Sequence, residues 1–216
     1  MERQIGSAQA AAQAPRREPQ SWLGKATLES VLEVNEQILA LLRAQCLAGV
    51  APPPLLREVG ALLMSLDARS LRCAAASAVL LVDVGWADAG LWSDAILGAV
   101  NDRPTRFPEP FFTVDGAVAV MRLAMTQAWH LARSEPGAAR LLLGVSAANV
   151  TVIGGCTLSR LTRVAEARIQ WLRPRWESRP TIWRDLLRTA CEGDSGALER
   201  LRGRGLQLLA AEARPG

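Results

Sequence analysis

The 216-residue chain has no tyrosine, one histidine and one lysine, and its four cysteines lie far apart in the sequence. The cysteines form no C-x-x-C pair, which argues against a local zinc site and against a disulfide-dense secreted module. His130 has no second histidine and no nucleophile or carboxylate pair at a recognisable spacing. Phosphate-binding loops and dinucleotide fingerprints are also missing. We therefore expect a protein that is not an enzyme and uses no metal or cofactor, with reduced and mostly buried thiols at Cys46, Cys73, Cys156 and Cys191.

Long apolar runs are absent as well. No stretch approaches the roughly 20 residues that a membrane span needs, and the N-terminal segment lacks the continuous apolar core of a secretory signal. These absences predict a cytoplasmic protein that makes no membrane contact and whose polar residues 1–21 form a disordered tail. Leucine and alanine dominate the rest and β-branched runs are short, so intrinsic propensity favours an all-α fold.

Apolar residues recur at helical spacing along most of the chain. The periodic segments predict helices over 28–47, 55–66, 67–82, 115–133, 134–144, 146–155, 157–172, 183–193 and 195–213. Small polar residues precede several of these segments and glycine follows one, which is the usual pattern of helix ends. The expected N-caps are Thr27, Asp67, Ser146 and either Asp194 or Ser195, and the expected C-terminal glycine is Gly144.

The two halves of the chain resemble each other. An offset of 90 residues places Trp86 on Trp176, and one added residue places Trp92 on Trp183. Rare residues at matched spacing favour an internal duplication. Between the halves, residues 101–113 carry three prolines and no helical period, so they are predicted to be a linker. We expect a first helical repeat over 22–100 and a second over 114–216, which also holds basic C-terminal helices.

A run of short motifs extends without a gap from residue 131 to residue 176. Ala138 and Ala139 precede L-G-V-S at 143–146, Leu161 and Ala165 lie near the start of the next helix, and R-P-R-W closes the run at 173–176. This segment resembles the FlhD family of flagellar transcriptional activators, in which A-A precedes L-G-[IV]-S and the tail reads R-F-R-F. The first half resembles the family only loosely, through V-N-E-Q-I-L at 34–39 and a leucine spacing that ends at Ala75.

The resemblance implies an all-helical fold in which FlhD-like units intertwine, so that two tandem copies would form an intramolecular pseudo-dimer. It also implies that the chain acts with an FlhC-like zinc-binding subunit, binds promoter DNA and helps to recruit RNA polymerase. The regulated genes would be flagellar or belong to a mobile element. Many family members have a cysteine that links two subunits; Val82 and Leu172 occupy its place here, so no such disulfide is expected.

Basic residues are concentrated in the last third of the chain. The formal net charge is +4, and residues 156–216 contain twelve arginines and seven acidic residues. Such a surface suits phosphate contact, although a solvated, salt-bridged helix face explains it equally well, and a GC-rich genome would also favour arginine. The first half has V-D-V-G-W where the second has R-P-R-W, so the arginines are specific to the second half. The candidate DNA- or partner-binding residues are Arg160, Arg163, Arg173, Arg175, Arg179, Arg184 and Arg188.

The segment W-L-R-P-R-W-E-S-R-P-T-I-W at 171–183 combines three tryptophans with three arginines. Packing is the more common role of tryptophan, so we expect the tryptophans to hold a repeated corner and the arginines to lie on the surface. Replacing Arg173, Arg175 and Arg179 with alanine should then spare folding and weaken DNA binding or assembly. A helix-turn-helix over 146–170 is a further possibility. The alternative function is a helical adaptor or secretion chaperone that binds a protein partner and no DNA.

Overall fold

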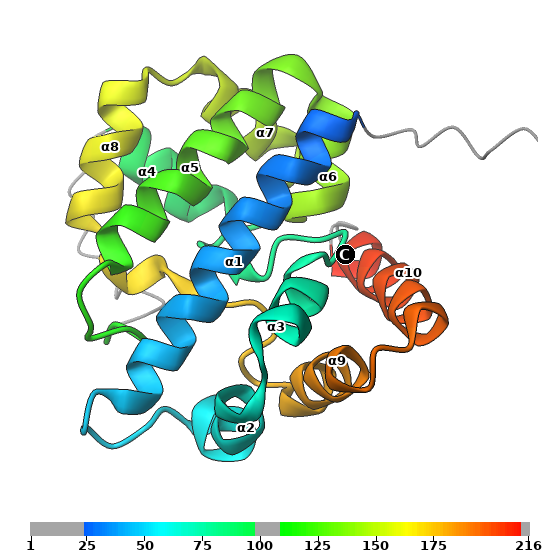
Figure 1. Ribbon diagram of the computed structural model, residues 1–216. Coiled ribbons are helices and arrows are strands. Elements are labelled where there is room, and N and C mark those ends of the chain that lie inside the picture. Colours follow the sequence, from blue (N-terminus) through cyan, green and yellow to red (C-terminus); the bar gives the residue numbers. More distant parts are fainter. Residues whose placement is uncertain (1–23, 98–108, 213–216) are drawn as a thin grey trace, which may run out of the picture.

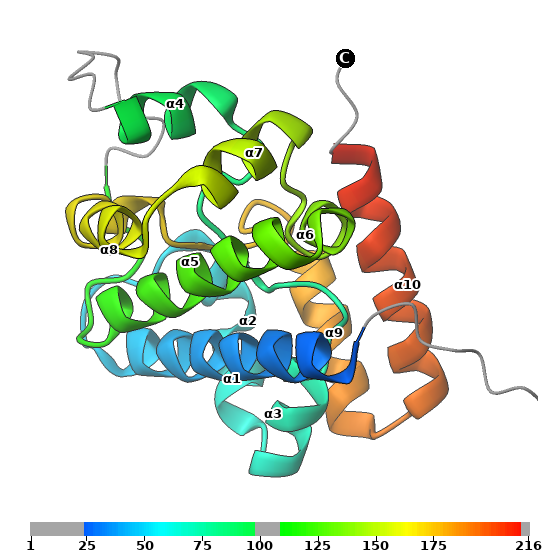
Figure 2. The ribbon, with the colours of Figure 1, turned by 90° about the horizontal axis from the view of Figure 1, so that it is seen from above.

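The computed structural model describes residues 24–97 and 109–212 (Figures 1 and 2). Most of these residues are helical, and one two-residue strand pair is present among them. The predicted all-α class is therefore confirmed. The predicted tail at 1–21 and residues 101–108 of the predicted linker lie outside the described residues. The elements of the first half are α1 (Lys25–Leu47), α2 (Pro54–Ser65), α3 (Ala68–Ala75), β1 (Val82–Asp83) and α4 (Ala89–Leu97).

The second half contains six α-helices and one short strand within the described residues. Each predicted helix is present, with shifted ends in several cases. Ser146 caps its helix by accepting a hydrogen bond from Asn149 N, and Gly144 ends the preceding helix at a φ of 67°. The elements are α5 (Ala117–Ser134), α6 (Pro136–Leu143), α7 (Ala147–Gly155), α8 (Leu158–Ala167), a 3-10 turn (Ile169–Trp171), β2 (Arg173–Pro174), α9 (Pro180–Glu192) and α10 (Ser195–Glu212).

Hydrogen bonds at the helix ends show which residues cap α1 and α10. α1 begins at Lys25 after Gly24, so Thr27 lies inside the helix and is not its cap. The Thr27 hydroxyl donates instead to Glu135 Oε1 at 2.9 Å, which joins the two halves. At α10, Asp194 accepts a hydrogen bond from Ala197 N at 2.9 Å and is therefore the capping residue.

The predicted helix over 67–82 is too long. Asp67 caps α3 as expected by accepting from Ser70 N at 2.7 Å, and this hydrogen bond lowers the pKa of the Asp67 carboxyl. The helix nevertheless ends at Ala75. The cause is Asn35, which is fully buried on α1 and donates to the carbonyls of Ala75 and Val79 at 3.0 and 2.9 Å. Its side-chain oxygen accepts from Leu81 N at 2.8 Å, so Asn35 holds the non-helical segment that follows α3.

α1 and α5 pack against each other at the centre of the molecule (Figures 1 and 2). Around them, α2 and α3 pack on α1, and α7 and α8 pack on α5. The chain then crosses over. α9, from the second half, packs on α2 and α3, while α4, from the first half, packs on α7. Buried residues of both halves consequently form one continuous hydrophobic core.

Several features recur 90 or 91 residues apart. α3 and α8 begin at residues 68 and 158, and each is capped by the preceding side chain, Asp67 in one case and Thr157 in the other. α4 and α9 begin at residues 89 and 180. The second half also has elements without a counterpart, because α6 aligns with a loop and α10 follows the last shared helix.

Candidate functional site

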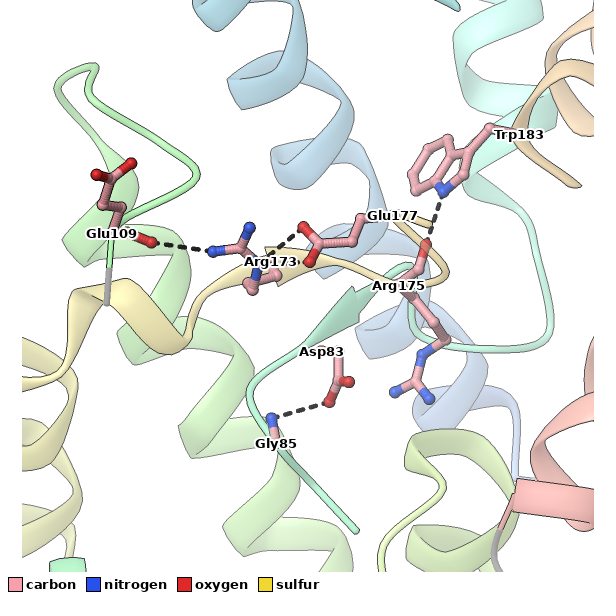
Figure 3. Close-up of polar contacts among 7 residues, drawn as sticks. All are labelled: Asp83, Gly85, Glu109, Arg173, Arg175, Glu177 and Trp183. Carbon is pink, nitrogen blue, oxygen red and sulfur yellow. Dashed lines mark hydrogen bonds and ion pairs between the residues drawn. The ribbon is translucent and has the colours of Figure 1, made fainter. Parts of the chain in front are cut away.

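The two halves meet at a short antiparallel strand pair, β1 with β2 (Figure 3). In this pair Val82 faces Pro174 and Asp83 faces Arg173. Asp83 and Arg173 are 90 residues apart, so this rung of the pair joins two positions that correspond at the offset relating the two halves. Asp83 Oδ1 accepts from Gly85 N at 2.9 Å and from Trp86 N at 3.2 Å, which turns the chain directly after β1.

Arg175, the second arginine of the W-L-R-P-R-W segment, is buried at the crossing with only 4 % of its surface exposed. Its Nε donates to Leu80 O at 2.7 Å, and its Nη2 donates to Val82 O at 3.1 Å and to Leu143 O at 2.7 Å. Its backbone N–H donates to Leu81 O at 2.8 Å. The expectation that Arg175 is a surface residue for DNA is therefore wrong for this conformation, because its guanidinium is already committed to backbone carbonyls from both halves.

Three tryptophans of the repeated corner form its apolar lining, as predicted, whereas the fourth, Trp176, is only half-buried. Trp86, Trp92 and Trp183 are at most 1 % exposed. Trp86 and Trp92 stack with ring centroids 5.7 Å apart. Trp183 Nε1 donates to Arg175 O at 2.6 Å, and Trp92 Nε1 donates to Gly85 O at 3.0 Å (Figure 3 shows the first of these). The two indole hydrogen bonds are equivalent, because Trp92 and Gly85 in the first half correspond to Trp183 and Arg175 in the second.

Arg173 is half-buried on the other side of β2, with 20 % of its side chain exposed. Its Nε pairs with the Glu177 carboxylate at 2.7 Å, and its Nη1 donates to Glu109 O at 3.0 Å (Figure 3). The guanidinium also lies over the ring of Phe111, 5.6 Å from its centroid. Arg173 therefore anchors residues at the end of the predicted linker, where Phe111 and Phe112 are buried.

The other five candidate arginines lie on α8 and on α9 with its N-cap. On α8, Arg163 is exposed and Arg160 is half-buried. On α9, Arg184 pairs with Glu58 of α2 at 2.8 Å, while Arg179 and Arg188 are exposed and make no ion pair within the described residues. α8 and α9 lie apart in both views of the ribbon (Figures 1 and 2). The candidate residues thus form two separate exposed groups rather than one face.

The helices α7 and α8 correspond to the predicted helix-turn-helix over 146–170. They are joined through Cys156 and Thr157, and both pack on α5. Trp129 of α5 donates from its indole N–H to Cys156 O at 2.8 Å, which holds this connection. Leu161 and Ala165 are buried, so the opposite face of α8 carries the exposed Arg163.

Two buried asparagines and a groove were not identified from the sequence. Asn35 directs the end of α3, and Asn149 donates to Trp86 O at 2.8 Å across the halves. A polar residue inside an apolar helical pattern is the only signal that could have indicated them. The groove lies between α3 and α10 and contains Arg69, Arg72 and Arg202. Its elements are 120 residues apart in sequence, so no local pattern reveals it.

The four cysteines are free thiols at different depths. Burial raises the pKa of Cys46 and of Cys156 above the ordinary thiol value, despite the opposing effect of nearby arginines. Because the pKa is raised in the folded state, the stability that comes from the protonated thiol is fully present below the pKa of the unfolded chain and is lost as the pH rises from there through the folded-state pKa. Within residues 24–97 and 109–212, no group of three or more histidine, cysteine or acidic side chains is placed to hold a metal ion.

In the described part of the chain, no single helix is long and apolar enough to cross a membrane; α6 and α7 meet that test only as a pair, which is bent by 117°. No protein-family model, curated protein or solved structure matches the chain. The architecture itself defines a helical protein whose two halves cross at a buried arginine.

Proposed function

We propose that the chain is a transcriptional regulator built from two FlhD-like repeats that form an intramolecular pseudo-dimer. In this proposal it binds promoter DNA together with an FlhC-like zinc-binding subunit and helps to recruit RNA polymerase. The observation that carries the proposal is the strand pair at the crossing, in which Asp83 faces Arg173. A two-fold interface between identical units pairs a residue on the axis with its own counterpart, and these two residues are counterparts at the 90-residue offset.

The exchange of helices between the halves gives further support. In a two-fold arrangement, each contact between the units has a mirror contact with the roles reversed. α9 packs on α2 and α4 packs on α7, and at a 90-residue offset α9 corresponds to α4 and α7 to α2. The matching indole hydrogen bonds of Trp92 and Trp183 fit the same relation. An exchange of this kind is what intertwined FlhD-like units would produce.

The pseudo-dimer proposal predicts the oligomeric state of the isolated protein. Because both copies are contained in one chain and bury their shared surfaces against each other, no second chain is needed to complete the core. Sedimentation equilibrium of the chain alone should therefore give a monomer of 23.2 kDa. A stable dimer at micromolar concentration would show that the two halves do not replace a partner copy.

Binding of DNA is assigned to the exposed arginines that remain after Arg175 is excluded. Arg179 and Arg188 belong to the exposed group at α9, and Arg163 belongs to the group at α8. Exposed guanidinium groups without a carboxylate partner are free to neutralise phosphates, whereas Arg184 is already paired with Glu58. These residues come from the second half, which fits a division between a structural first copy and a binding second copy.

A gel-retardation assay tests this function. The chain, mixed with the product of its neighbouring gene, should retard the promoter fragment upstream of its own operon at low salt, and binding should weaken steeply as salt rises. The Arg179→Ala, Arg188→Ala double variant should lower affinity and reduce the slope of log K against log salt by about 2, since each lost phosphate contact removes about 1. Arg57→Ala is the matched control, because Arg57 is an exposed arginine of the first half.

The outcomes distinguish a transcriptional regulator from a helical adaptor or chaperone. If no fragment is retarded at low salt with the neighbouring protein present, the proposal that the chain binds DNA is refuted, and the adaptor or chaperone becomes the better function. Equal loss in the double variant and in Arg57→Ala would show a diffuse charge effect rather than a binding face.

A further inference from the structure

An open groove lies between α3 of the first half and α10 of the second. Its free volume is about 740 Å³. Apolar side chains from three helices contribute to its surface, namely Leu32 from α1, Cys73 from α3 and Leu198 from α10. Ala68 and Ala76 leave its α3 wall shallow, so the backbone of an incoming segment is able to approach closely.

The polar residues of this α3–α10 groove are mostly arginines. Arg69, Arg72 and Arg202 contact it, and Glu199 is the acidic residue among its contacts, which leaves two excess positive charges. Arg69 is exposed and makes no ion pair within the described residues. Arg72 pairs with Glu36 only at 3.5 Å and keeps 76 % of its side chain exposed. The groove therefore combines an apolar floor with a positive rim.

Arg202 provides a more specific signal. Its Nη1 pairs with Glu199, but its Nε is buried and has no acceptor in the described residues. A buried donor without a partner is unusual in a folded protein. A carboxylate placed in the groove, which Arg202 lines, would supply a further acceptor for this guanidinium, because arginine binds carboxylates with particular geometric preference.

A small metabolite fits these features less well than a protein segment. Small-molecule sites bury most of their ligand's surface, whereas half of the residues that line this groove are exposed. An amphipathic helix that lays its apolar face into a groove between helices is a common recognition mode, with anchors spaced three and four residues apart.

Nucleic acid also fits less well. Phosphates would gain nothing from the apolar floor formed by Leu32, Cys73 and Leu198. Burial of apolar surface is the main source of affinity available here, and it requires an occupant with an apolar face.

We propose that the α3–α10 groove docks an acidic amphipathic helix of a protein partner. Leucine-like side chains of that helix cover Leu32 and Leu198, and its flanking carboxylates meet Arg69, Arg72 and Arg202. This docking is independent of the DNA contact proposed above, because it uses α3 and α10 and none of the arginines at Arg163, Arg179 and Arg188. Either function is able to fail without the other.

The experiment uses the full chain and two synthetic fluorescent peptides of about 18 residues, long enough to be helical. One peptide carries leucines at positions i, i+3, i+4 and i+7 with glutamates beside them, and the other has lysine in place of every glutamate. Fluorescence anisotropy should show saturable binding of the glutamate peptide and little binding of the lysine peptide. Arg69→Glu should weaken the glutamate peptide about tenfold or more, since it places a like charge at the rim.

A second variant tests the shape of the site without changing its charge. Ala68→Trp adds a large side chain to an exposed position at the edge of the groove, so it should block the peptide while thermal melts stay at the wild-type value. Arg188→Glu, on the exposed face of α9, is the matched charge control and should bind the peptide as wild type does. Weaker binding in both groove variants, with the control unchanged, would establish the docking site.

Other outcomes overturn the proposal. No binding of the glutamate peptide would do so, as would equal binding of the two peptides. If Arg69→Glu and Arg188→Glu weakened binding equally while Ala68→Trp had no effect, the peptide would be held by overall charge. If a short DNA duplex displaced the peptide, and Ala68→Trp did not prevent the peptide from binding, the groove would be a polyanion site instead.

Discussion

Replacement of Arg175 by methionine tests the central claim about the crossing, that this arginine is structural rather than a surface residue. Methionine has a similar length and is apolar, so it fills much of the same space and removes only the guanidinium. The backbone carbonyls of Leu80, Val82 and Leu143 then lose the guanidinium as a donor, and Val82 O keeps only the indole N–H of Trp86 as a side-chain donor, at 3.3 Å. These carbonyls come from β1, from the residues before it and from the end of α6, so both halves are affected.

The expected loss is large compared with that for an exposed arginine. A hydrogen bond to a charged donor contributes about 1.5–3 kcal/mol, and a buried acceptor left without a donor costs about 1–3 kcal/mol. The three bonds share one side chain and the carbonyls are able to relax toward water, so the terms do not add fully. We expect the free energy of unfolding to fall by about 3–5 kcal/mol, less than the full sum of three hydrogen bonds to a charged donor. This is a substantial part of the ~5–15 kcal/mol that stabilises a typical domain.

Urea unfolding followed by tryptophan fluorescence and far-UV circular dichroism measures this change. With a slope of about 2–3 kcal/mol per molar urea, the midpoint should fall by about 1–2 M. Arg179→Met is the matched control, since Arg179 is exposed and lies four residues away; its midpoint should stay within about 0.3 M of wild type. Arg175→Lys should also be destabilised, because an ammonium group lacks the planar fork that reaches several carbonyls. A midpoint for Arg175→Met as high as that of the control would refute the structural role.

The remaining predictions concern a hydrogen bond, two glycines and two thiols. Trp183→Phe removes the 2.6 Å indole hydrogen bond and should lower the free energy of unfolding by about 1–2 kcal/mol in the same assay; an unchanged midpoint would show that the bond contributes nothing. Gly144→Ala should lower the free energy of unfolding by about 1–3 kcal/mol, because the φ of Gly144 is 67° and an added Cβ would lie 3.1 Å from a leucine methyl group. Gly203→Ala is the control: an added Cβ would meet nothing within 4 Å, so this variant should raise Tm slightly. Iodoacetamide at neutral pH, followed by mass spectrometry, should modify exposed Cys191 well before Cys156, whose pKa is raised by burial; the reverse order would contradict the burial of α7's end.

The helices were accessible to sequence reasoning because their signals are local. Apolar spacing, a capping side chain such as Asp67 or Ser146, and a left-handed glycine at Gly144 act within a few residues of the helix they define. The same holds for the tryptophans, because large apolar side chains are buried wherever a core is available. The error at α3 arose from a distant residue, since Asn35 lies 40 residues before the carbonyl that it captures at Ala75.

The arginines could not be sorted from sequence alone. Arg173, Arg175 and Arg179 alternate with tryptophans in one short segment and have the same chemical type. Arg173 is half-buried against Glu177, Arg175 is buried among backbone carbonyls, and Arg179 is exposed. What separates them is their surroundings in the fold, because backbone carbonyls of both halves bind Arg175, Glu177 and the carbonyl of Glu109 bind Arg173, and Arg179 faces solvent. Substituting all three together would therefore mix a folding defect with any surface effect.

The sequence by itself determined that this protein is helical, where most of its helices lie, and that two corners of the chain share a tryptophan pattern. These properties follow from short-range spacing and propensity. Only the tertiary structure decided that the halves cross, that Asp83 meets Arg173, and that α3 and α10 enclose a groove with a positive rim. The physical reason is that burial and hydrogen-bond partners depend on segments some 90 to 120 residues apart, and the exposure of an arginine is settled only when those segments come together.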